Sequence, residues 1–233
     1  MLIKKIYMYL SVMSLLLAPQ TFLYAQKPGD VDCNGKIDIL DGLKVAQYYV
    51  GVISDFGPCG CPVEIPDEHF DNCIREELGI IGRAITSRDV QDILTFWGYE
   101  FEIEDLTGAE YFVSLEKALF YMNRISDLKP LSRLISLKLL MLDINNITDV
   151  TPLAGLINLH NLSLDENEIT DIKPLAGLTS LQTLSLANNR ITDISVLSRL
   201  SALENLSLQG NPLDDNSIAL IDELRARGVN VSY

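Results

Sequence analysis

The sequence has few of the residues from which catalytic and nucleic-acid-binding sites are built. Only two of its 233 residues are His, and these, His69 and His160, belong to different elements, so no catalytic constellation forms around them. Lys and Arg number 18 against 32 Asp and Glu, a deficit that argues against contacts with nucleic-acid phosphates. We therefore do not expect an enzyme, and nucleic acid is not an expected partner.

Long apolar runs are also missing after the first 25 residues. Two lysines, the apolar run IYMYLSVMSLLLAP and the segment TFLYA predict a signal peptide, residues 1–25, cleaved after Ala25. A membrane anchor is the rival, but Ser11, Ser14 and Pro19 interrupt the run, and a spanning helix needs about 20 apolar residues. We expect a secreted, extracellular protein with no integral membrane segment after cleavage.

Cysteine is scarce, with only Cys33, Cys59, Cys61 and Cys73. Four cysteines in an exported chain suggest two disulfides with three pairings. Because Cys59 and Cys61 are too close to pair comfortably, we favour Cys33 with Cys59 and Cys61 with Cys73. Swapped partners remain open, and a four-thiolate zinc site is the remaining alternative.

The second half of the chain repeats every 22 residues. A degenerate copy spans 93–114, four copies align without a gap over 115–202, and a further copy starts at Leu203. We call these copies coils 1 to 6 and number the positions in each from 1 to 22. Leu at positions 1, 4 and 6 alternates with variable residues, as in a short strand with one buried side.

Three polar or rigid residues recur at fixed positions in the coils. Asn at position 9 carries both donors and an acceptor, so it can satisfy the backbone where each coil leaves its strand. Asp at position 13 suits the cap of a turn, and Pro at position 16 breaks any long helix. The asparagines form a structural ladder of Asn123, Asn145, Asn167, Asn189 and Asn211.

The repeated phrase N-x-I-[ST]-D-I-x-P-L-x-x-L resembles the leucine-rich repeats of internalin-like bacterial proteins, over about residues 64–233. The resemblance implies an α/β solenoid of 22-residue coils with a parallel sheet on its concave face. It also implies a short helical N-terminal cap. The domain bounds that we expect are 59–92 for this cap, 93–213 for the repeats and 214–233 for a C-terminal cap.

Both caps have sequence signatures. IPDEHFDNCIREELG predicts a helix with Asp67 at its N-cap and Gly79 past its end, which places Phe70, Cys73, Ile74 and Leu78 on one face. A second helix is expected near ITSRDV, where Thr86 and Asp89 have capping-box spacing. At the other end we expect a helix stopping at Gly228, followed by an extended piece over 229–233.

Side chains at positions 3, 5 and 7 are expected to project from the concave face. In coils 1 to 3 they form an apolar patch, which we propose as the ligand-binding site because large exposed apolar patches mark interaction surfaces. Alternatively, the degenerate first coil or the cap buries these side chains. The patch consists of Trp97, Tyr99, Leu119, Tyr121, Leu139 and Met141.

The segment GDVDCNGKIDILDGLKVAQYYVG has the spacing of a calcium loop followed by a helix. The candidate Ca²⁺ ligands at loop positions 1, 3, 5, 7, 9 and 12 are Asp30, Asp32, Asn34, Lys36 through its carbonyl, Asp38 and Asp41. An EF-hand has Glu at position 12, whereas Asp41 is shorter. Residues 29–51 resemble one type I dockerin repeat. Dockerins carry two such repeats and bind cohesins, so the resemblance implies that residues 26–58, with their one repeat, form a dockerin-like module whose partner would be a cohesin.

We therefore expect a secreted, non-enzymatic binding protein that recognises a protein or glycan ligand on its concave face, with Ca²⁺ stabilising the N-terminal module. One alternative is a component of a cohesin-dockerin assembly that degrades polysaccharides. The other is a structural surface or matrix protein.

Overall fold

The computed structural model describes residues 62–233. These residues divide between two compact units: Glu64–Arg83 with Gln91–Tyr233, and residues 62–63 with Ala84–Val90. The expected signal peptide, the calcium loop and Cys33, Cys59 and Cys61 all lie outside the described residues. None of the helices within 62–233 has the length and apolarity that crossing a membrane requires.

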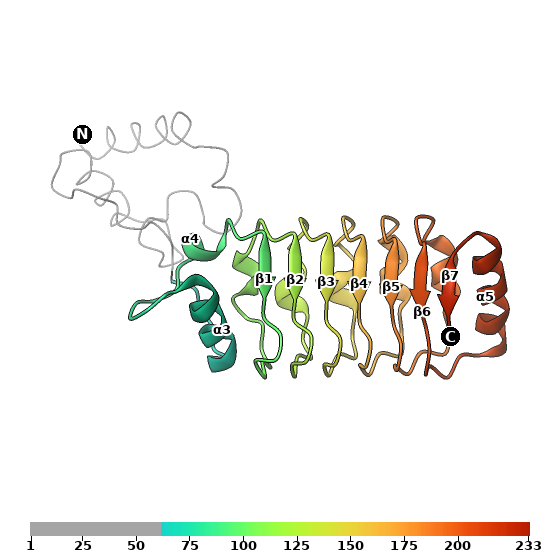
Figure 1. Ribbon diagram of the computed structural model, residues 1–233, viewed down its shortest axis with the longest axis horizontal. Helices are drawn as coiled ribbons and strands as arrows, with labels where there is room; N and C mark the ends of the chain where they lie inside the picture. Colours follow the sequence, from blue (N-terminus) through green and yellow to red (C-terminus); the bar gives the residue numbers. More distant parts are fainter. Residues whose placement is uncertain (1–61) are drawn as a thin grey trace, which may run out of the picture. The chain divides into compact units, whose positions relative to one another are not determined.

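The larger unit is a solenoid whose strands form one seven-stranded parallel sheet in chain order (Figure 1). Strand neighbours in coils 1 to 6 are 22 residues apart, as in the pairs Thr95 with Lys117 and Lys117 with Leu139. Strands β1 to β6 cover positions 3 to 5 of their coils, and β7 follows the last helix. The strands are β1 Thr95–Trp97, β2 Lys117–Leu119, β3 Leu139–Met141, β4 Asn161–Ser163, β5 Thr183–Ser185, β6 Asn205–Ser207 and β7 Asn230–Ser232.

Short 3₁₀-helices form the opposite side of the coils, and in coils 2 to 4 the Pro at position 16 prevents a longer helix. In coils 2 to 5 the Asp at position 13 bonds the first amide of the 3₁₀-helix. The Asp149 carboxylate accepts a hydrogen bond from the Thr151 amide at 2.8 Å, and Asp171 accepts one from Lys173 at 2.9 Å. The 3₁₀-helices are η1 Ala109–Tyr111, η2 Lys129–Leu131, η3 Thr151–Leu153, η4 Lys173–Gly177 and η5 Ser195–Arg199. Between strands and 3₁₀-helices, the repeated Leu and Ile side chains fill a core with almost no exposure.

An aromatic cluster closes the N-terminal end of this core. Helix α3, Glu68–Leu78, buries Phe70, whose ring centroid lies 6.0 Å from Phe96 and 6.1 Å from Phe120. A Cβ atom at Gly98, the position where later coils have Leu or Phe, would come within 2.9 Å of the rings of Phe96 and Phe120. Coil 1 therefore lacks its repeat leucine because larger aromatic rings already fill that space.

The expected N-terminal helix is confirmed, with one difference. Asp67 is its N-cap, accepting a hydrogen bond from the Phe70 amide at 3.0 Å, and Gly79 ends it with a φ of 65°. Phe70, Cys73 and Ile74 are buried, but Leu78 is only partly covered. Asp67 also accepts hydrogen bonds from the amides of Glu104 and Asp105 in coil 1, at 2.7 and 2.9 Å. One carboxylate thus starts the helix and ties it to the first coil.

The smaller unit contains helix α4, Ser87–Val90. The Thr86 amide donates to the Asp89 carboxylate at 2.8 Å, and the Asp89 amide donates to the Thr86 carbonyl at 3.0 Å. Pro62 and Thr86 form an isolated antiparallel bridge. The helix start predicted from the capping-box spacing is therefore confirmed.

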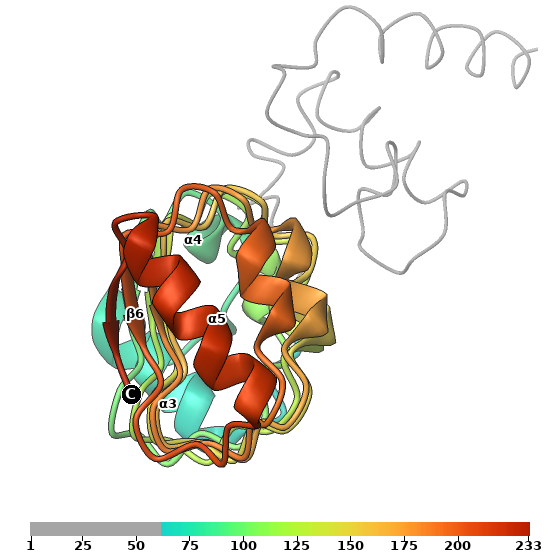
Figure 2. The same ribbon diagram turned by 90° about the vertical axis from the view of Figure 1, so that its right-hand side faces the viewer.

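The C-terminal end is closed by α5, Asp215–Ala226, which lies across the last coil (Figure 2). The sequence predicts an extended piece after it, and the structure adds that this piece is strand β7, paired with β6. Val231 within β7 is buried. The fold is thus the expected leucine-rich repeat solenoid with a parallel sheet and a cap at each end.

Candidate functional site

The solvent-facing side of the sheet is the expected concave face. Position 4 of each strand points into the core, whereas positions 3 and 5 are exposed or half-buried in every coil. Trp97 keeps 48% of its surface exposed, and the other five members of the apolar patch are half-buried. Neither the first coil nor α3 therefore buries the predicted patch, and all six side chains lie on one face over neighbouring strands.

Two tyrosines of this patch stack on each other. The rings of Tyr99 and Tyr121 stack with centroids 4.8 Å apart and planes within 3° of parallel. Both occupy position 7, so the stacking distance matches the spacing of neighbouring strands. Partial burial, together with Tyr99 and the Glu100 carboxylate nearby, raises the pKa of the Tyr121 hydroxyl. The stacked rings therefore present a flat aromatic surface, and the Tyr121 hydroxyl stays protonated at neutral pH.

Position 7 changes from Tyr to Asp in coils 3 and 4. The Asp143 carboxylate accepts hydrogen bonds from the Ser163 hydroxyl and from the Asp165 amide. In the next coil Asp165 accepts from the Ser185 hydroxyl at 2.7 Å and from the Ala187 amide at 2.6 Å. Burial, with the like charge of Asp143 nearby, raises the pKa of Asp165, although the bonds from Ser185 and Ala187 oppose this. Each carboxylate thus bridges its own coil to the following one.

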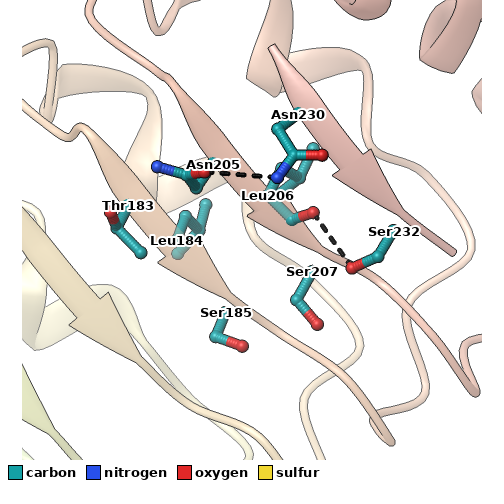
Figure 3. A pocket seen from close by; sticks show the side chains of 8 residues that line it. All are labelled: Thr183, Leu184, Ser185, Asn205, Leu206, Ser207, Asn230 and Ser232. Atoms are coloured by element: carbon teal, nitrogen blue, oxygen red, sulfur yellow. Dashed lines mark hydrogen bonds between the residues drawn. The ribbon is translucent and has the colours of Figure 1, made fainter.

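Beyond these acids the face becomes neutral and polar. A hollow of about 130 Å³ lies over β5 to β7 (Figure 3). The Asn230 side chain donates to that of Asn205 at 3.4 Å, and the Ser232 hydroxyl is 3.4 Å from the Leu206 carbonyl. The hollow is lined by Thr183, Leu184, Ser185, Asn205, Leu206, Ser207, Asn230 and Ser232. From N- to C-terminus, the face is therefore apolar, then acidic, then neutral.

Sequence reasoning missed two apolar side chains beside the patch. Met122 and Ile144, at position 8, are 44% and 42% exposed and have φ values of 58° and 55°. Bulky residues rarely adopt such left-handed backbone, and a β-branched residue is an outlier there. Position 8 holds Asn188 and Gly210 in later coils. Asn and Gly are the residues that adopt positive φ most readily, so their presence indicates from the sequence that this position requires positive φ.

The asparagine ladder lies inside the coils and makes the same contacts in each. The Asn167 side-chain oxygen accepts from the Ile147 amide at 3.0 Å, and its nitrogen donates to the carbonyls of Leu142 and Leu164 at 2.9 and 3.1 Å. Asn123, Asn145, Asn189 and Asn211 bond in the same way to their own neighbouring coils. These residues hold successive coils together and leave no polar group for a ligand.

Cys73 carries a free thiol, buried on α3, with its sulfur 3.6 Å from the Trp97 carbonyl oxygen. This differs from the expected bond to Cys61, which lies outside the described residues together with Cys33 and Cys59. Burial, with the Glu77 and Glu76 carboxylates nearby, raises the pKa of Cys73 to about 12.

The six candidate calcium ligands fall in the undescribed segment, so that site stays a prediction. Within residues 62–233, no three His, Cys, Asp or Glu side chains gather where they could hold a metal ion.

Comparisons with known proteins agree with the repeat pattern. A family model described as leucine-rich repeats in two copies matches residues 157–199 and 179–225. No curated protein matches the sequence.

Two solved structures illustrate the similarity of fold. An internalin (inlF) from Listeria monocytogenes aligns with a TM-score of 0.59 and 25% identity over 74% of this chain. A leucine-rich repeat protein from Leptospira interrogans aligns with a TM-score of 0.58 and 26% identity over 62% of this chain. The aligned region spans 57% of the first and 38% of the second. The repeats therefore have the leucine-rich repeat solenoid fold, similar to that of these two structures.

Proposed function

We propose that this chain is a secreted, non-enzymatic binding protein that holds a protein ligand on the concave face of its repeats. The exposed Trp97 beside the Tyr99–Tyr121 stack carries the proposal. Trp and Tyr are the residues most enriched among binding hot spots, and stacked rings lose little conformational freedom on binding.

The repeat architecture supports this function. The apolar patch lies on rigid strands supported by the buried leucines and asparagines, so its shape is set before a ligand arrives. A binding surface of this kind avoids the ordering cost that flexible loops bring to association. The charge of the chain, with its 32 acidic residues, also favours solubility outside the cell.

The test removes the aromatic anchors without disturbing the core. Wild type and a Trp97→Ala, Tyr121→Ala variant are immobilised, and captured proteins are quantified by mass spectrometry. Because hot-spot truncations cost about 2 kcal/mol or more each, we expect specific capture to fall at least about 30-fold. An Ile135→Ala, Ile157→Ala variant is the matched control, since these side chains are exposed, at 55% and 57%, and lie at position 21 of their coils, outside the strands. Equal capture by wild type and the Trp97→Ala, Tyr121→Ala variant would show that the concave face is not the binding site.

The N-terminal segment is a separate proposal that rests on sequence alone. Residues 26–58 bind Ca²⁺ through the Asp30 to Asp41 loop, because that spacing supplies the oxygen ligands the ion needs. Calorimetric titration of the full chain with Ca²⁺ tests it, with an Asp30→Ala, Asp32→Ala variant as control. If the heat of Ca²⁺ binding is the same for wild type and variant, the loop is not the calcium site.

A further inference from the structure

The ligand surface contains a row of side chains that runs across the coils. Position 7 places Tyr99, Tyr121, Asp143 and Asp165 in four consecutive coils. Neighbouring strands lie about 4.8 Å apart, and the stacked tyrosines have the same 4.8 Å spacing. Asp143 and Tyr121 belong to neighbouring coils and are therefore about one strand spacing apart, so the apolar and the anionic surfaces are adjacent.

The two carboxylates of this row have neutral hydrogen-bond donors but no cation. Within residues 62–233, no ion pair includes Asp143 or Asp165. Acids on other sides of the coils do pair, as Glu168 does with Arg190 at 3.2 Å and Glu116 with Lys138 at 2.6 Å. Half-buried neighbouring carboxylates of like charge repel each other, and a cation between them would remove that cost.

The single basic residue among positions 3, 5 and 7 does not neutralise the pair. Lys117 stands at position 3 of coil 2, four residues from position 7, which is about 13 Å along an extended strand. Glu100 and Glu166, at position 8, add further negative charge on the same side of the row. The face thus attracts a cation at one place, next to its apolar patch.

We propose that the ligand of the concave face is a protein segment that carries a basic side chain beside an apolar one. The basic group binds Asp143 and Asp165, and the apolar group packs on Trp97, Tyr99 and Tyr121. Arginine suits the site better than lysine because its planar guanidinium can contact a carboxylate and an aromatic face together. This inference rests on the function proposed above.

The geometry also sets the spacing of the two groups in the ligand. Trp97 and Asp143 belong to coils two apart, which separates them by about 10 Å across the sheet. An extended peptide rises about 3.3 Å per residue, so the basic residue should lie two to four positions from the apolar anchor.

The probe is a phage-displayed library of random twelve-residue peptides, selected on the immobilised full chain. We expect wild type to enrich peptides with Arg or Lys two to four positions from Trp, Phe, Tyr or Leu. An Asp143→Asn, Asp165→Asn variant keeps the side-chain oxygens that accept the Ser163 and Ser185 hydroxyls, so its fold is preserved while its charge is lost. This variant should retain the apolar preference and lose the basic one.

A double-mutant cycle then isolates the contact. The best peptide and its Arg→Gln version are measured against wild type and the Asn variant. We expect the Arg→Gln change to weaken binding to wild type about tenfold and binding to the Asn variant less than twofold. A Glu76→Gln, Glu223→Gln variant, with the same charge removed from α3 and α5, should behave as wild type.

Two results would overturn the inference, and they differ from failure of the proposed function. Selected peptides without a basic residue at that spacing would overturn it, as would an equal Arg→Gln effect on wild type and the Asn variant. If the Trp97→Ala, Tyr121→Ala variant selects the same peptides as wild type, the concave face itself is excluded.

Discussion

Replacing Asn167 by Ala tests the most specific structural contact of the repeats. The Asn167 side chain spans two coils, and its oxygen is the acceptor for the buried Ile147 amide at 3.0 Å. The carbonyls to which its nitrogen donates keep a second donor, because Asn145 also bonds the Leu142 carbonyl at 3.0 Å and Asn189 bonds that of Leu164 at 2.9 Å. The main loss is therefore one buried N–H group without an acceptor.

The expected magnitude follows from these contacts. An unsatisfied buried donor costs about 1–3 kcal/mol, and the lost donor bonds add about 1 kcal/mol. We expect Asn167→Ala to lower the free energy of unfolding by about 3 kcal/mol. Asn211→Ala should cost less, because this last asparagine is only half-buried and water can replace part of its bonding.

Urea unfolding followed by far-UV circular dichroism measures both variants at pH 7. With a slope of about 2 kcal/mol per molar urea, the Asn167→Ala midpoint should fall by about 1.5 M. Asn158→Ala is the control, since that exposed side chain donates only to the Ile135 carbonyl at 2.8 Å and its loss should stay within about 0.5 kcal/mol. A change below about 1 kcal/mol for Asn167→Ala would refute the ladder as a source of stability.

Three further outcomes are expected. Burial raises the pKa of Asp67, but amide hydrogen bonds from Asp105, Glu104, Phe70 and His69 lower it by more, so this group stabilises the fold at neutral pH. Asp67→Ala should therefore lower the free energy of unfolding by about 1–2 kcal/mol at pH 7. The difference in unfolding free energy between wild type and variant should become smaller as pH falls through the lowered pKa of Asp67. A difference that stays constant down to pH 3 in chemical unfolding would contradict this. Asn188→Ile should destabilise the fold by about 1–2 kcal/mol because φ is 56° at this position, whereas Asn188→Gly should leave stability nearly unchanged. Equal unfolding midpoints for the two variants would show that the turn tolerates branched residues. Iodoacetamide should modify Cys73 in urea without reductant, because its thiol is free. In the native chain the reaction should be slow, because the thiol is buried and its pKa is about 12. A mass spectrum that shows no modification in urea would mean that Cys73 is in a disulfide.

Much of the solenoid could be predicted because its contacts repeat with the chain. Leu at positions 1, 4 and 6 predicted a strand with one buried side, and that strand is found at positions 3 to 5 in six coils. The Asp67 and Thr86 caps also follow from spacing, since a helix start depends on residues three apart. The positions of the apolar patch on the open face follow from the same alternation.

The arrangement of side chains on the concave face depends on contacts between coils and could not be predicted from the sequence. The 22-residue period places Tyr99 beside Tyr121 but does not say whether their rings stack, and only the structure shows that the ring planes are within 3° of parallel. Residue types give no indication that Asp143 and Asp165 are half-buried without a cation, because pairing depends on which side chains neighbouring coils bring near. Nor do they indicate that Ile144 is held at a positive φ.

The sequence by itself determined the repeat, its caps and the residues that face solvent, because each of these depends on residues close together in the chain. Only the tertiary structure decided which of those residues act together. Phe70 and Phe120 are 50 residues apart in the chain, yet they close one aromatic cluster with centroids 6.1 Å apart. Such distances are set by the stacking of coils and the docking of α3, which no local pattern encodes.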